Sequence, residues 1–217
     1  MLSLTSFLMN KIIKYLMLSD ICIFTGFGLI SPILAIFIKE DVRGGTIFAA
    51  GLATTIFMIV KGVIQLPFSR YIDKHDDKLK WLKVGTLIIA IVPVLYIFVK
   101  DVTHIYLVEV LHGIGSGLAF PTWLGMWSTH LDKGHESFEW SLYSTLVGAG
   151  AAITAGIGAA LAQYIGFNFT FLLVAIFSFF GFLLLFGLGP QKDRKGKISS
   201  TQYHIKRKVL NQHSGGR

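Results

Sequence analysis

Residues 169–188 read FTFLLVAIFSFFGFLLLFGL, a stretch without a charged side chain. A helix rises ~1.5 Å per residue, so ~20 apolar residues are what it needs to cross the ~30 Å hydrocarbon layer of a bilayer. The stretch is continuously apolar and does not alternate with polar residues, which favours a helix over a strand of a membrane barrel. It therefore predicts a transmembrane helix.

Five comparable stretches precede it in the 217-residue chain. Hydrophobic residues make up 53% of the sequence and charged residues only 15%, a balance that no soluble core explains. We expect an all-α membrane protein with a transmembrane domain at residues 15–188, a short segment before it (1–14) and a basic tail after it (189–217). The six expected transmembrane helices span residues 15–37, 47–68, 81–99, 105–127, 141–165 and 169–188.

The distribution of Lys and Arg predicts how these helices are oriented. With both termini in the cytoplasm, sixteen of the 20 Lys and Arg residues lie on the cytoplasmic side, three lie on the opposite side, and Lys61 lies within the second span. We therefore expect a multi-pass protein of the plasma or inner membrane. Its net charge of +8 requires no nucleic acid as a partner. The basic tail is expected to contact anionic lipid headgroups, at ~1 kcal/mol per cation.

Small residues recur at every fourth position of the fifth span and so share one helix face. Such faces let helices approach closely in lipid, where burial away from water offers little. We expect this small-residue face to pack against another helix, with a glycine hinge as the alternative. Its members are Ser144, Gly148, Ala152, Gly156 and Ala160.

The fourth span carries two ionisable side chains, Glu109 and His112, three residues apart on one face. An ionised side chain at mid-span costs ~2.5–3.5 kcal/mol on insertion scales, so this face should line the bundle interior or a wet pathway. The pair can share or pass a proton; the alternative is that the two side chains only hydrogen-bond locally. Steps of three or four residues continue the face through Gly113, Ser116, Phe120, Trp123 and Trp127.

Asp20 in the first span and Lys61 in the second form another candidate pair. Their expected depths from the cytoplasmic edge are ~7 and ~10 Å, so we expect them to meet. Such a pair is either a static link between two helices or one that breaks and reforms during a transport cycle. Gln65, one turn beyond Lys61, extends the polar face.

Three segments resemble the major facilitator superfamily. Residues 69–78, SRYIDKHDDK, are similar to the signature loop that this family places between its second and third helices, with Asp73 and Lys74 at matching positions. Residues 26–32, GFGLISP, resemble the glycine-rich first helix of family exporters. Residues 109–117, EVLHGIGSG, resemble the fourth-helix pattern, with Glu109 in the place of the family's arginine.

The resemblance implies a secondary transporter of a small solute that works by alternating access, without a cofactor or metal. It also implies that Asp73 and Lys74 steady a gate by contacting a partner subunit. Family members join two six-helix halves, whereas this chain supplies one. We therefore expect a second copy of the chain as partner, and protons as a candidate coupling ion. The alternatives are a second half-chain in a heteromeric transporter, a fragment of a longer protein, or a membrane partner that does not transport.

An enzyme is the remaining class. Ser116 lies among glycines on the fourth of six expected helices, as the nucleophile of rhomboid intramembrane proteases does. Those enzymes take their base from a histidine on the sixth helix, and residues 169–188 contain none. No catalytic residue is therefore expected.

Overall fold

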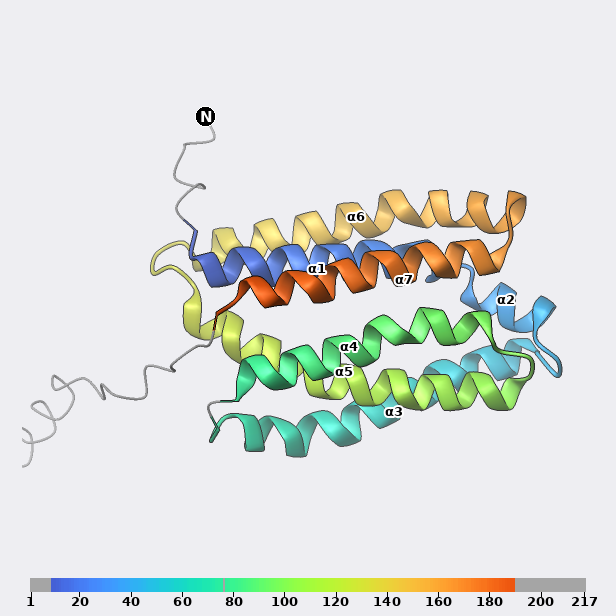
Figure 1. Cartoon of the computed structure of the whole chain (residues 1–217), viewed down its shortest axis with the longest axis horizontal. Coiled ribbons are helices and arrows are strands. Elements are labelled where there is room, and N and C mark those ends of the chain that lie inside the picture. Colours follow the sequence, from blue (N-terminus) through green and yellow to red (C-terminus); the bar gives the residue numbers. More distant parts are fainter. Residues whose placement is uncertain (1–8, 76, 190–217) are drawn as a thin grey trace, which may run out of the picture.

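The computed structural model describes residues 9–75 and 77–189. Every regular element in this part of the chain is helical, which confirms the expected all-helical fold (Figure 1). The elements are α1 (Lys11–Ile30), α2 (Leu34–Asp41), α3 (Ile47–Ile72), α4 (Lys78–Ile97), α5 (Val102–His130), α6 (Glu136–Tyr164), α7 (Phe167–Leu184) and the 3-10 turn η2 (Leu185–Gly187).

Five of these helices, α1, α3, α4, α6 and α7, are long and apolar enough to cross a bilayer. α5 has 29 residues and is long enough, but it is not among the five. Its apolar character is lowered by Glu109 and by His104 and His112. The crossing of α5 and the side of the membrane on which the termini lie stay predictions.

The expectation of one continuous helix over residues 15–37 is wrong at its end. α1 stops at Ile30, and α2 begins at Leu34 after a turn in which the Ile33 N–H donates to the Ile30 carbonyl at 3.0 Å. Pro32 lies inside this turn and has no N–H with which to continue the helical ladder. The chain therefore bends here, and α2 lies across one end of the bundle (Figure 1).

The helices form two groups of three. α3 and α4 both pack along α5, while α6 and α7 both pack along α1. The two groups meet chiefly where α4 packs on α7, with a smaller contact between α1 and α5. Figure 1 shows the groups as an upper layer of α6, α1 and α7 and a lower layer of α4, α5 and α3.

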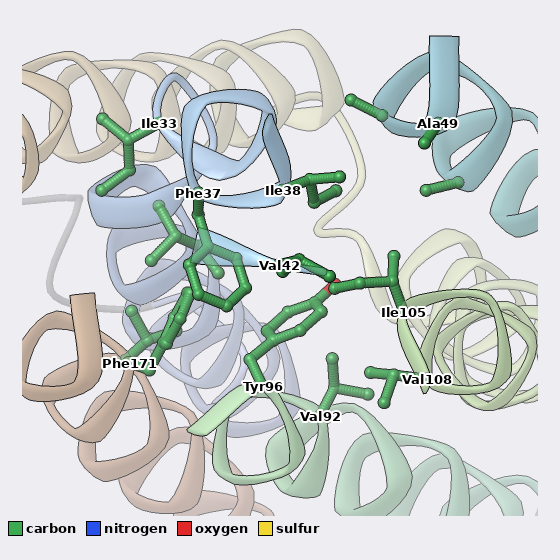
Figure 2. Packing of buried hydrophobic residues seen from close by; sticks show 14 of the residues in the cluster. Ile33, Phe37, Ile38, Val42, Ala49, Val92, Tyr96, Ile105, Val108 and Phe171 are labelled. Atoms are coloured by element: carbon green, nitrogen blue, oxygen red, sulfur yellow. The ribbon is translucent and has the colours of Figure 1, made fainter. Parts of the chain in front are cut away.

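Two hydrophobic clusters hold the groups together, one near each end of the bundle. In the first, α2 directs Phe37 onto Phe171 of α7, with ring centroids 4.8 Å apart, and Tyr96 of α4 packs on the same ring (Figure 2). The second contains Leu16 of α1 and Trp127 of α5, both fully buried. Each cluster joins helices from both groups, so the described part of the chain forms one domain.

Glycines set the closest helix contacts. A Cβ atom at Gly158 of α6 would overlap the backbone carbonyl of Leu29 on α1, and one at Gly85 of α4 would lie 2.7 Å from the Gly115 carbonyl oxygen on α5. Close backbone approach of this kind favours helix association in lipid through packing. The α1–α6 and α4–α5 contacts therefore depend on these positions having no side chain.

Substituting valine at Gly158 tests this contact. We expect Gly158→Val to destabilise the folded chain by about 1–3 kcal/mol, because the new side chain must displace the α1 backbone. Gly156→Val, two residues away on α6, is the matched control, since a Cβ there meets nothing within 4 Å. Thermal unfolding of both variants as detergent-solubilised monomers measures the difference. Equal melting temperatures would contradict the close approach of α1 and α6.

Candidate functional site

Glu109 lies in the interior of the bundle. It lies two turns into α5. The N-cap residue Asp101 precedes this helix, and its carboxylate accepts hydrogen bonds from the N–H groups of Thr103 and His104. Glu109 is 4% exposed, and the buried Tyr96 hydroxyl of α4 donates to its Oε1 at 2.5 Å. A carboxylate so far from solvent requires such a donor.

His112 is the second neighbour of this carboxylate. Its Nδ1 lies 3.5 Å from Glu109 Oε2. The imidazole stacks on Phe27 of α1, with ring centroids 5.2 Å apart, and contacts Phe57 of α3 at 4.4 Å. Side chains from α1, α3, α4 and α5 therefore meet around one acid and one imidazole. A phenol, a carboxylate and an imidazole in contact can store a proton or pass it on.

Sequence reasoning brought Glu109 and His112 together but missed Tyr96, Phe27 and Phe57, which surround them. Only Tyr96 left a signal, since it is the one tyrosine within the expected span 81–99. The two phenylalanines cannot be told from lipid-facing or core residues by pattern alone.

The expected pair of Asp20 and Lys61 does not form. Asp20 Oδ2 accepts a hydrogen bond from the Tyr143 hydroxyl of α6 at 2.9 Å. The Lys61 Nζ lies 4.9 Å from the ring centroid of Phe120 on α5 and 5.9 Å from that of Phe57. The physical reason is the packing: α1 and α3 are consecutive long helices, but each belongs to a different group of three.

Toward the C-terminal end of α5, two residues of the same face belong to an aromatic cluster. Trp123 stacks on Trp127, with ring centroids 4.9 Å apart, and contacts Tyr143 of α6 at 5.0 Å; Trp140 lies 5.4 Å from Trp127. Trp123 and Trp127 are buried, and neither indole N–H reaches an acceptor within residues 9–75 and 77–189. We define the aromatic cluster as these four residues.

The remaining residues of the expected pathway lie along the same helices. Ser116 of α5 is buried among the helices, whereas Phe120 is 42% exposed. Gln65 of α3 is half-buried. The α5 face therefore changes along its length, from an enclosed acid at Glu109 to an aromatic side chain that is open at Phe120.

A network of hydrogen bonds joins the start of α1 to the connection between α5 and α6. The Asn10 N–H donates to Asp132 Oδ2 at 3.1 Å, and the Asn10 amide donates to the His130 carbonyl at 3.2 Å. The Asp132 N–H in turn donates to Glu139 Oε2 at 3.2 Å. Glu139 is 1% exposed. Sequence reasoning missed this network because its members lie outside the expected spans.

The expected gate residues lie at the turn between α3 and α4. Asp73 follows the last residue of α3, and its N–H donates to the Ser69 carbonyl at 3.0 Å. Both Asp73 and Lys74 are exposed. The structure thus places them at one end of the bundle, close to the start of α4.

The expected small-residue face of α6 points away from the rest of the chain. All five of its members are exposed, and a Cβ at Gly148 or Gly156 would meet nothing within 4 Å. α6 packs on α1 through a different face, where Gly150 lies against Thr25 and Gly158 against Leu29. Within the described part of the chain, the small-residue face therefore has no helix beside it.

The donor groups do not suggest a metal centre. Within residues 9–75 and 77–189, no three His, Cys, Asp or Glu side chains gather closely enough to hold a metal ion.

Comparison with known families finds a match. The sequence model of the Major Facilitator Superfamily matches residues 16–213, from within α1 to beyond α7. No curated protein matches the sequence.

Removing the Tyr96 hydroxyl tests the enclosed acid. We expect Tyr96→Phe to lower the free energy of unfolding by about 1–3 kcal/mol, because Glu109 Oε1 then loses its donor while still buried. Tyr106→Phe on α5 is the control, since no hydrogen bond of that half-buried hydroxyl is found in the described part of the chain. The measurement is thermal or denaturant unfolding in detergent. If the two variants were equally stable, the Tyr96–Glu109 bond would have no structural importance.

Proposed function

The chain belongs to the Major Facilitator Superfamily, and on this premise we propose that it is a secondary active transporter of a small solute that works by alternating access. Proteins of this family are integral membrane transporters, and the five apolar helices agree with that location. The plasma or inner membrane is the proposed site. The proposed orientation has both termini in the cytoplasm, and the basic tail, which lies outside the described residues, would contact anionic lipid there.

The observation that carries this function is the enclosed acid at Glu109. An ionisable group inside a transmembrane helix costs free energy to bury, and such groups mark ion or proton pathways. Here it contacts His112 and Tyr96, and the ring contacts of His112 extend the group to α1 and α3. We propose that Glu109 binds the coupling proton and that His112 exchanges it. A change in the charge of this pair would then alter the contacts between the two groups of helices.

The assembly is proposed to be a homodimer. In the apolar windows of α6 and α3, only 11% and 17% of residues are buried, against 39% to 44% in α1, α4 and α7. The small-residue face of α6 is open along its length. Small side chains permit close helix contact, so a second copy related by a two-fold axis is proposed to pack against α3 and α6. A different half-chain would meet the same exposed face.

The turn between α3 and α4 is the proposed gate. Asp73 and Lys74 are exposed at one end of the bundle, beside a helix that the proposed dimer would bring against its partner. Opposite charges on adjacent residues can contact a partner subunit in one state and release it in the other.

Proton coupling is tested in vesicles. Purified protein is reconstituted with a pH-sensitive dye inside, and a panel of small solutes is added. For a transported solute, we expect Glu109→Gln to retain solute counterflow and to lose at least ~10-fold of the solute-driven pH change, because an amide cannot bind the proton. Glu40→Gln, exposed on α2, is the matched control and should behave as the unmodified protein. A full pH response in Glu109→Gln would rule out the coupling role.

Assembly is tested by mass in nanodiscs. We expect two chains of 24.0 kDa per particle. Gly156→Leu should weaken dimerisation at least ~10-fold by blocking the small-residue face, whereas Ala35→Leu, exposed on α2, should not. A single chain per particle, without solute flux, would indicate that this protein is a partner of another membrane protein and does not itself transport. Co-purification with a different six-helix chain would favour a heteromeric transporter.

A further inference from the structure

Asp20 on α1 and Lys61 on α3 carry opposite charges and contact different side chains. The Lys61 Nζ lies 4.9 Å from the Phe120 ring centroid, and Asp20 accepts from the Tyr143 hydroxyl at 2.9 Å. The Tyr143 ring lies 5.0 Å from Trp123. Phe120 and Trp123 are three residues apart and therefore neighbours on the same face of α5. The side chains that contact Lys61 of α3 and Asp20 of α1 are therefore linked through neighbouring positions of α5.

Neither charge is neutralised within the described part of the chain. Asp20 receives a hydrogen bond from a neutral hydroxyl, and Lys61 is held over aromatic rings; neither forms an ion pair with another described residue. Both side chains are half-buried within long apolar helices. A charge there costs several kcal/mol unless an opposite charge approaches it. This arrangement favours a ligand that brings one charge of each sign.

The aromatic side chains on the Asp20 side favour a particular kind of cation. Tyr143, which hydrogen-bonds Asp20, contacts Trp123, and the Trp140 ring centroid lies 6.1 Å from the ring centroids of both. Aromatic faces attract alkylated ammonium groups, and a nearby carboxylate adds charge attraction. The Lys61 end, by contrast, offers an ammonium donor beside Phe57 and the exposed Phe120, which suits an anionic group.

We propose that the solute is a zwitterion whose alkylated ammonium group lies at Asp20 beside the aromatic cluster and whose carboxylate lies at Lys61. A simple cation would be repelled by Lys61, and a simple anion by Asp20. This inference rests on the proposed transport function, for which it names the substrate class. The zwitterion has to be long enough to reach from Asp20 on α1 to Lys61 on α3.

Matched probes test the charge requirement. Three of the 4 tryptophans of the chain belong to the aromatic cluster, so the variant Trp81→Phe in nanodiscs, excited selectively at tryptophan, restricts tryptophan fluorescence to this site. The zwitterions are glycine betaine, γ-butyrobetaine and 6-trimethylammoniohexanoate. Choline has the trimethylammonium group but lacks the carboxylate. 3,3-Dimethylbutyrate has the shape and the carboxylate of glycine betaine but lacks the positive charge. We expect saturable fluorescence changes with at least one zwitterion, and at least ~10-fold weaker binding of the two singly charged probes.

Two variants identify which end each side chain holds. Asp20→Asn should remove the preference over 3,3-dimethylbutyrate and keep the preference over choline. Lys61→Gln should remove the preference over choline and keep the preference over 3,3-dimethylbutyrate. A general folding defect would weaken all probes together, so only this crossed pattern supports the assignment.

The outcomes separate the two proposals. Zwitterion binding with the crossed pattern but without flux in vesicles would support the site and overturn transport. Flux of another solute, with no saturable response to any of the three zwitterions, would overturn the site and leave transport standing. Choline or 3,3-dimethylbutyrate binding as tightly as the zwitterions would also overturn the inference.

Discussion

The carboxylate of Glu109 has to be satisfied by other parts of the same chain, because lipid hydrocarbon offers it no hydrogen bond. Tyr96 supplies a donor from α4, and His112 supplies an imidazole from the next turn of α5. His112 is in turn enclosed by rings from α1 and α3. One acid therefore restricts the positions of four helices at once. A change in its proton occupancy would act where the two groups of helices approach each other.

Around this acid, close packing takes the place of the hydrophobic effect. Helices in lipid gain little from hiding apolar surface, so their contacts depend on shape. Gly158 lets α6 approach α1, and Gly85 and Gly115 let α4 approach α5. The face of α6 that carries Gly148 and Gly156 also has small side chains, but no other helix of the described chain packs against these two glycines. The two faces are chemically alike, but one joins helices within the chain, and the other is available to a partner.

Charge is distributed differently between the two parts of the proposed pathway. Glu109 has neighbours that stabilise it inside one chain. Asp20 and Lys61 each have only neutral or aromatic neighbours among the described residues. The first arrangement suits a carboxyl group that exchanges a proton with a neighbouring side chain. The second suits charged side chains that bind a solute from outside the chain. This difference is why the proton is proposed to use Glu109 and His112, and the solute Asp20 and Lys61.

Local features of the chain were predictable from sequence. The long apolar stretches had to be helices, because a helix satisfies its backbone hydrogen bonds internally, and Glu109 and His112 had to be neighbours, because a spacing of three residues places them on one face. The break near Pro32 was missed, although proline gives a local signal for it. The partner of Asp20 was not predictable, because Lys61 and Tyr143 are both polar side chains on apolar helices, and only the packing of α1 on α6 selects Tyr143. Similarly, α6 has small residues on more than one face, so its periodicity could not show that Gly158 rather than Gly156 contacts α1. The sequence by itself thus determined the helices and the residues that share a face, since these follow from the geometry of one helix. The tertiary structure decided which faces meet, because that depends on the packing of all the helices together.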